Sequence, residues 1–143
     1  MSERAGTRGP GDGGRAWPQT VAVVAGGAVG ALARSGVSVA LPDDPVGVGT
    51  VVVNLVGALL LGVLVARPMG DVAAVFWRAG VLGAFTTFSA MSADAAALGW
   101  WGAPYLLVVV GSGLAAAHVG LRAGRAVAVR RMPEDGAGEQ GPP

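Results

Sequence analysis

Four long apolar stretches follow one another along the chain, separated by short segments that contain proline, glycine or charged residues. Their approximate bounds are residues 17–41, 48–66, 72–98 and 103–127. A helix that crosses the hydrocarbon core of a bilayer needs about 20 mostly apolar residues, and each stretch has about that length or more. Strands of a membrane barrel are shorter and alternate in hydrophobicity. The pattern therefore predicts an all-α membrane protein with four transmembrane helices.

The two ends of the chain have a different character. Residues 1–16 and 132–143 are rich in glycine and polar residues and have no apolar period, which predicts disordered tails around one transmembrane domain at 17–131. Arginines before the first stretch and Ala31-Leu32-Ala33 within it also fit a cleaved signal peptide. Because the apolar run continues past that site and further spans follow, we interpret the first stretch as a transmembrane helix.

Composition supports the membrane interpretation and excludes several classes of protein. Only 13% of the residues are charged, whereas soluble domains carry about 25%. Between Ala79 and Leu121 the ionisable groups are Asp94, Tyr105 and His118. The absence of cysteine excludes disulfides and thiolate sites, and a single histidine argues against an imidazole-based metal site. A net charge of +1 argues against a nucleic-acid partner. The sequence shows no nucleophile–base pair or metal cluster, so we do not expect an enzyme.

The arginines predict how the chain is oriented. Lys and Arg accumulate in cytoplasmic segments of membrane proteins, and nine of the ten basic residues here fall on one side of a four-helix bundle. These nine are Arg4, Arg8, Arg15, Arg67, Arg78, Arg122, Arg125, Arg130 and Arg131. We therefore expect a multi-pass protein of the cell (plasma) membrane with both termini in the cytoplasm.

Polar groups inside the predicted spans are the candidate functional residues, because they are costly at membrane depth. In the first span, Gly26, Gly30 and Arg34 recur every four residues and share one helix face. The glycines are explained by close helix packing, whereas Arg34 has to snorkel, pair or line a wet cavity. In the second span, Asn54 is the one amide among Val and Leu, and it serves either as an interhelical hydrogen bond or as a donor to a passing anion.

The middle of the third span, residues 80–94, is unusually rich in glycine, threonine and serine. We expect a helix that is broken near its middle, which would free backbone carbonyls as ligands for Na⁺. Phe88 and Met91 are three residues apart and share a face, for which core packing is the plain interpretation. In the fourth span, we interpret Ser112 as bonded to the backbone of its own helix. We interpret His118 as a buried histidine with satisfied hydrogen bonds and not as a proton relay.

Three blocks carry a resemblance to a known family: G-x-x-x-R at 30–34, G-T-x-x-x-N-x-x-G at 49–57 and G-x-x-T-T-F-S at 83–89. In this order, on the first, second and third of four short helices, they resemble the Fluc (CrcB-type) fluoride channels over about residues 21–126. The resemblance implies a fluoride-specific channel that exports cytoplasmic fluoride passively and so lowers its toxicity. It also implies an antiparallel dimer with two narrow pores.

The resemblance also implies residue roles. Asn54 matches the pore asparagine, and Arg34 matches an arginine that helps assembly or attracts anions. Gly83 and Thr86 match the helix break whose carbonyls hold a structural Na⁺ at the dimer centre. The further pore positions that it implies are Thr87, Phe88, Met91 and Ser112. Met91 stands in the place of a second pore phenylalanine, and Asp94 stands where glutamate is commoner.

The arginine bias conflicts with a homodimer of antiparallel chains, which requires insertion in both directions. We therefore expect a heterodimer with an oppositely oriented paralogue. Two other functions remain open on the sequence. A proton-coupled small multidrug exporter needs a membrane-embedded carboxylate, for which Asp94 is the candidate. A non-transporting membrane scaffold would use Asn54 and the glycines only for packing.

Overall fold

The computed structural model describes residues 13–41 and 47–129, and within these ranges every regular element is a helix. Four of its helical segments are long and apolar enough to cross a membrane: Ala16–Ala40, Val48–Val65, Asp71–Ala97 and Gly99–Val129. The four predicted spans are therefore confirmed. Most of the two predicted tails lies outside the described residues. Residues 13–16 already belong to the first helix, because an apolar pattern marks the part that a bilayer covers and not where the helix begins.

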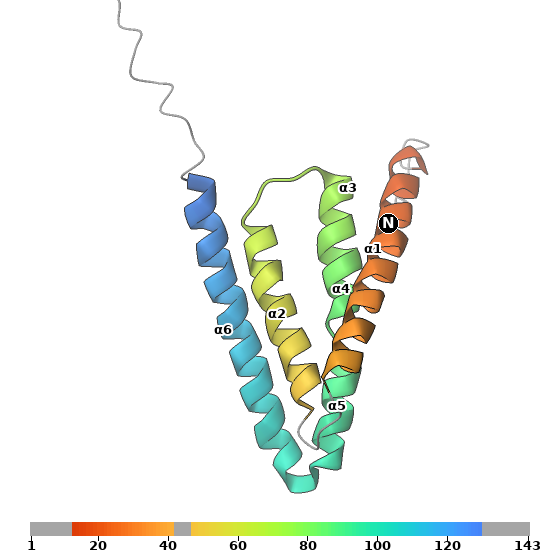
Figure 1. The fold of residues 1–143 in the computed structure, drawn as a ribbon. Coiled ribbons are helices and arrows are strands. Elements are labelled where there is room, and N and C mark those ends of the chain that lie inside the picture. Colours follow the sequence, from red (N-terminus) through yellow and green to blue (C-terminus); the bar gives the residue numbers. More distant parts are fainter. Residues whose placement is uncertain (1–12, 42–46, 130–143) are drawn as a thin grey trace, which may run out of the picture.

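The helices run alternately up and down, as Figure 1 shows. Helices α1 (Gly13–Ala40) and α2 (Val48–Val65) form the first two spans. The third span is built from α3 (Asp71–Ala74), the π-helix η1 (Val75–Leu82), α4 (Gly83–Phe85) and α5 (Phe88–Ala97). A short 3₁₀ turn, η2 (Gly99–Trp101), leads into α6 (Gly102–Val129). The start of α1, the α2–α3 connection and the end of α6 consequently lie at the same end of the bundle (Figure 1).

Helix α1 packs against η1 through glycines at which the two backbones touch. A Cβ atom on Gly26 would overlap the carbonyl oxygen of Phe76, and one on Gly30 would overlap that of Val81. Small residues at a four-residue spacing permit this approach between membrane helices. The glycine spacing that the sequence shows in the first span is thus explained by packing within the chain.

Helices α2 and α6 form a second closely packed pair. A Cβ atom on Gly62 would overlap the carbonyl oxygen of Ala117, and one on Gly120 would overlap that of Leu59. Because lipid tails are as apolar as leucine, van der Waals contact of this kind takes the place of the hydrophobic effect as a driving force between membrane helices. The two glycine-packed pairs make up the frame that holds the polar residues of the middle.

The outer surface of the chain is strongly apolar. Few side chains are buried, whereas large apolar residues such as Leu32, Leu107 and Val108 are mostly exposed. His118 is also exposed on α6, so its interpretation as a buried histidine is wrong, because this face of α6 turns away from the other helices. Such a surface suits hydrocarbon or a partner chain and does not suit water.

Candidate functional site

The third span contains two consecutive residues with extended backbone. Helix α4 ends at Phe85, Thr86 has φ −77° and ψ 156°, and Thr87 has φ −147° and ψ 116°, after which α5 begins at Phe88. The side chain of Asn54 in α2 binds this segment at two points. Its Oδ1 accepts a hydrogen bond from the Thr87 amide at 2.9 Å, and its Nδ2 donates to the Thr87 carbonyl at 3.0 Å.

The backbone of Thr87 determines which way the Asn54 amide faces, because an N–H requires an oxygen and a carbonyl requires an NH₂ group. The second hydrogen of Nδ2 is directed to the carbonyl of Thr50, one turn earlier in α2, at 3.0 Å. Both amide hydrogens of Asn54 are therefore engaged within the chain. Of the two roles that the sequence leaves open for Asn54, the interhelical bond is present in this structure.

The Asn54 contact removes donors from the helical ladder of the third span. In an unbroken helix the Thr87 amide would bond the carbonyl of Gly83, four residues earlier, but here it is directed to Asn54. The Ala90 amide would likewise bond the carbonyl of Thr86, but it donates to Oγ1 of Thr87 at 3.2 Å, which makes Thr87 the N-cap of α5. The carbonyls of Gly83 and Thr86 thus lose their ladder partners.

Contacts with two residues, Leu82 and Gly57, fix Thr86. Its hydroxyl and its amide both donate to the carbonyl of Leu82, at 3.0 Å and 3.1 Å, and close the last turn before the extended pair. Its methyl group occupies the space beside Gly57, where a Cβ atom would overlap it. The glycine that ends the second-span motif therefore makes room for the threonine of the third-span motif.

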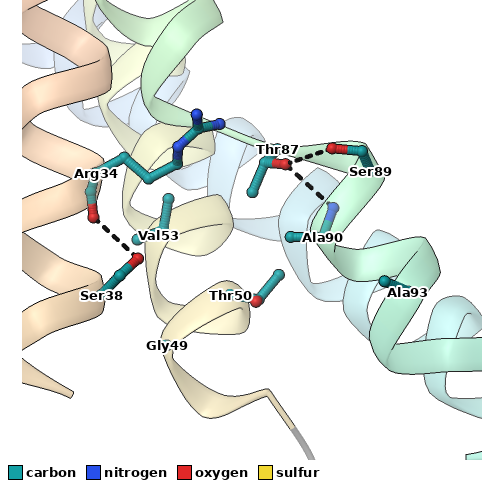
Figure 2. Close-up of a pocket in the computed structure, with 9 residues that line it drawn as sticks. All are labelled: Arg34, Ser38, Gly49, Thr50, Val53, Thr87, Ser89, Ala90 and Ala93. Atoms are coloured by element: carbon teal, nitrogen blue, oxygen red, sulfur yellow. Dashed lines mark hydrogen bonds between the residues drawn. The ribbon is translucent and has the colours of Figure 1, made fainter. Parts of the chain in front are cut away.

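Arg34 lines a pocket of about 450 Å³ between α1, α2 and α5. Figure 2 shows its side chain reaching from α1 toward the side of the pocket where Thr87 and Ser89 lie. Four residues with hydroxyl groups also line this pocket: Ser38, Thr50, Thr87 and Ser89. Thr87 and Ser89 also share a hydrogen bond of 3.1 Å. A fixed positive charge among hydroxyl groups is an arrangement that attracts and solvates an anion.

A second pocket, of about 380 Å³, lies between α2, the third span and α6. Its polar lining residues include Asn54, Thr86 and Arg78, and its apolar ones include Met91 and Leu82. Asn54 and Thr87 therefore separate two pockets, each of which contains one arginine. Because Asn54 bonds both the N–H and the carbonyl of Thr87, a shift of α2 against the third span would change both pockets.

Of the remaining predicted site residues, Met91 lines the second pocket, whereas Phe88 and Ser112 line neither pocket. Met91 is buried, but Phe88 is 70% exposed, so core packing fits Met91 and is wrong for Phe88. Phe88 is the first residue of α5 and has no preceding helical turn to cover it. Ser112 donates to the carbonyl of Val109 in its own helix at 2.9 Å and lines neither of the two pockets.

Sequence reasoning did not predict that residues of the third span meet both ends of α2. Arg78 donates to the carbonyls of Leu64 and Arg67 at the carboxyl end of α2. The carboxylate of Asp94 lies against Gly47, the left-handed N-cap of α2 (φ 66°), where a Cβ atom would overlap it. Each charge has the sign that the helix dipole favours at that end. A charged residue inside a predicted span is the sequence feature that could have indicated these contacts. The sequence analysis uses the charge of Arg78 only to predict the orientation of the chain.

Comparison with known proteins decides the family. The sequence profile described as "CrcB-like protein, Camphor Resistance (CrcB)" matches residues 21–121, which include all four spans in whole or in large part. The chain belongs to the CrcB family. Residues Arg34, Asn54, Thr87 and Arg78 all lie inside the matched range. The membership and the four apolar helices make it a multi-pass membrane protein.

Several curated CrcB relatives carry the name of a fluoride channel. "Fluoride-specific ion channel FluC" of Cereibacter sphaeroides is 44% identical over 113 residues, which are 74% of this chain and 83% of the relative. "Fluoride-specific ion channel FluC 2" of Thermobifida fusca is 49% identical over 86 residues, 55% of this chain and 64% of the relative. "Fluoride-specific ion channel FluC 1" of Mycobacterium bovis is 36% identical over 125 residues, 79% of this chain and 95% of the relative.

Proposed function

We propose that this chain is a subunit of a fluoride-specific channel that lets cytoplasmic fluoride leave the cell passively. The observation that carries the proposal is the contact between Asn54 and both backbone groups of Thr87, beside the Arg34 pocket. Its CrcB relatives named as fluoride-specific ion channels support the same conclusion. A passive channel of this kind needs no catalytic residue.

The pockets have the chemistry that a small, strongly hydrated anion requires. A pore selects such an ion by replacing its water with donors at close range. In this proposal Arg34 attracts the anion and the hydroxyl of Thr87 solvates it. Asn54 acts mainly by holding Thr87 in position, because both of its amide hydrogens are engaged. Phe88 would present the positive edge of its ring to the anion from its exposed position on α5.

A structural Na⁺ at the dimer centre forms a further part of the proposal. The carbonyls of Gly83 and Thr86 fit such an ion, because Asn54 and Thr87 take the amides that would otherwise bond them. Carbonyl oxygens released at a break in a membrane helix are suitable ligands for Na⁺. The ion would supply positive charge at depth and so offset the cost of bringing an anion there.

The active assembly would be an antiparallel dimer. The exposed Phe88 and the apolar outer surface supply area for a partner. Nine arginines on one side favour a single orientation in the cell membrane, with both termini cytoplasmic. The partner would therefore be an oppositely oriented paralogue. Relatives named FluC 1 and FluC 2 support the idea of paralogue pairs in this family.

Fluoride efflux from liposomes tests these proposals. The full-length chain is reconstituted alone and then together with the paralogue from the same cells, and chloride efflux is the control. We expect fluoride efflux well above chloride efflux, and only when both chains are present. Fluoride efflux from this chain alone would contradict the heterodimer but keep the channel. No fluoride efflux under either condition would contradict the channel itself.

The same liposomes test the exporter alternative. A proton-coupled exporter requires a carboxylate that the substrate can reach, but Asp94 lies against Gly47 at the end of α2 and lines neither of the two pockets. We expect fluoride efflux to proceed down its own gradient without an imposed pH gradient. Efflux of a cationic drug driven by a pH gradient would instead favour the exporter.

A further inference from the structure

Arg78 occupies an unusual position for an arginine. It lies within the third span, in η1, and is only partly accessible. Its Nη2 donates to the carbonyl of Leu64 at 2.7 Å and to that of Arg67 at 3.0 Å. These carbonyls belong to the carboxyl end of α2, where helices leave orphan acceptors and a positive charge is favoured. The guanidinium is therefore held in one place by backbone and is not free to extend into solvent.

Capping α2 does not use all the donors of this side chain. A guanidinium carries five N–H groups, and the two bonds to α2 use both hydrogens of Nη2. Nε is buried and has no acceptor, and Nη1 makes no hydrogen bond, among the residues that the structure describes. A buried donor of a charged group without an acceptor is costly. The capping role alone thus leaves the charge of Arg78 incompletely satisfied.

Arg78 lines the same pocket as Asn54 and Thr86. Apart from these three residues, the lining consists of glycine, alanine, leucine, methionine and valine. Such walls provide a low local dielectric, in which a fixed positive charge attracts an anion more strongly than it does in water. The lining described by the structure contains no carboxylate that would compete for the guanidinium.

We infer that Arg78 is the centre of an anion-binding site in this pocket, for a small hydrated anion of the size of fluoride. This inference rests on the proposed function for the identity of the ion, but not for the site itself. The site would be the counterpart of the Arg34 pocket, on the opposite side of the contact between Asn54 and Thr87. The anion would accept hydrogen bonds from N–H groups that capping leaves over, while Nη2 keeps α2 in place.

The test measures anion binding apart from transport. The full-length protein in detergent is titrated with sodium fluoride, with sodium gluconate at matched ionic strength as reference, and the thermal unfolding temperature is followed. A ligand that binds only the folded state stabilises it by RT ln(1 + [L]/Kd), so the rise of this temperature with fluoride concentration gives the dissociation constant Kd. We compare the wild type with Arg78→Gln and Arg78→Lys. The matched control is Arg122→Gln, which removes an exposed arginine of α6.

We expect Arg78→Gln to raise the fluoride dissociation constant obtained in this way by about tenfold or more, because the variant loses a charged hydrogen bond to the anion. Arg122→Gln should change it less than about twofold, since exposed charges are screened. Arg78→Lys keeps the charge and the fold but lacks the guanidinium fork, and an intermediate value is expected. If Arg78→Gln fails to fold, Arg78→Lys replaces it as the test. Weaker fluoride binding than in the wild type would then support the site, and unchanged binding would contradict it.

Two results would overturn the site. One is a wild type that fluoride does not stabilise beyond gluconate. The other is an Arg78→Gln protein that unfolds at a lower temperature in gluconate but keeps the wild-type fluoride dissociation constant, which would mean that Arg78 only caps α2. Liposome efflux measured in parallel separates this inference from the proposed function. Arg78-dependent binding without efflux supports the site alone, and efflux without Arg78-dependent binding supports the channel alone.

Discussion

Two kinds of contact join the four spans, and they differ in what they demand of the chain. Between α1 and η1, and between α2 and α6, glycines let backbones touch without any side-chain chemistry. Between α2 and the middle of the third span, an asparagine bonds an extended threonine and diverts its amide from the helical ladder. The first kind needs only small residues, whereas the second needs polar groups at membrane depth.

The difference indicates which contact is functional. Glycine packing lowers the free energy of the folded chain and requires no other explanation. The polar contact releases backbone carbonyls from the helical ladder and places a side-chain amide at membrane depth, where both are costly. Local choices that conflict with the surrounding structure are expected at functional sites. Four substitutions can break or sharpen this comparison.

Asn54→Ala should have the largest effect on transport. It removes both bonds to Thr87 and leaves a part-buried N–H and a part-buried carbonyl of the extended segment without their partner. We expect fluoride efflux from liposomes to fall by about a hundredfold, because the extended pair loses the group that fixes it. Asn54→Asp keeps an acceptor for the Thr87 amide but has no donor for the Thr87 carbonyl. Its fluoride efflux should therefore lie between that of the wild type and that of Asn54→Ala.

The control for Asn54 is Val52→Ala, which shortens a partly exposed side chain two residues earlier on α2. Its efflux should stay within about twofold of the wild type, as expected for a small change on the outer face of a helix. An Asn54→Ala protein that conducts at the wild-type rate would show that the contact with Thr87 is only packing, as in a scaffold.

The sequence allowed the spans to be placed closely, since a bilayer imposes length and apolarity on each of them. Helix α2, the third span from α3 to α5, and helix α6 begin and end within two residues of the predicted bounds. The sequence identifies both Asn54 and Thr87 as candidates, but it does not predict their contact, because the contact depends on the register of α2 against the third span. For Arg78 the sequence indicates only the charge, since its partners are backbone carbonyls, which no residue type identifies.

Gly30→Ala tests the other kind of contact. The added methyl would overlap the carbonyl of Val81, so α1 and η1 have to separate. We expect the folded protein to lose about 1–3 kcal/mol, seen as a lower thermal unfolding temperature, with smaller losses in efflux per folded channel. Gly27→Ala is the matched control, because its new Cβ atom meets nothing within 4 Å. Replacing a helical glycine that makes no such contact with alanine should stabilise the folded protein slightly, by up to about 1 kcal/mol.

Gly30→Ala also separates the two contacts from each other. If it abolished efflux while leaving the unfolding temperature unchanged, the glycine contact would have a functional part that the comparison denies. Gly27→Ala in the same helix makes the same change in helix propensity without the contact. Any difference between the two variants is therefore due to the contact of Gly30.

Arg34→Gln should reduce efflux by a smaller amount than Asn54→Ala. It leaves the contact between Asn54 and Thr87 intact and removes only the charge that lines the hydroxyl pocket. We expect about a tenfold loss at low ionic strength, which shrinks as salt is added, because attraction into a pocket by a fixed charge is screened. A loss that does not depend on salt would indicate that Arg34 holds the helices together and does not attract the anion.

Ser112→Ala should have the smallest effect, and for this reason it is a sensitive test of where the pore runs. In this chain the hydroxyl donates to the carbonyl of Val109 in its own helix, so its removal leaves no buried donor unsatisfied. We expect efflux within about threefold of the wild type and an unchanged unfolding temperature, since local bonds of this kind contribute little. A loss of tenfold or more would mean that in the working channel the hydroxyl turns from Val109 to the ion. The polar path would then extend along α6, beyond the two pockets that meet at Asn54.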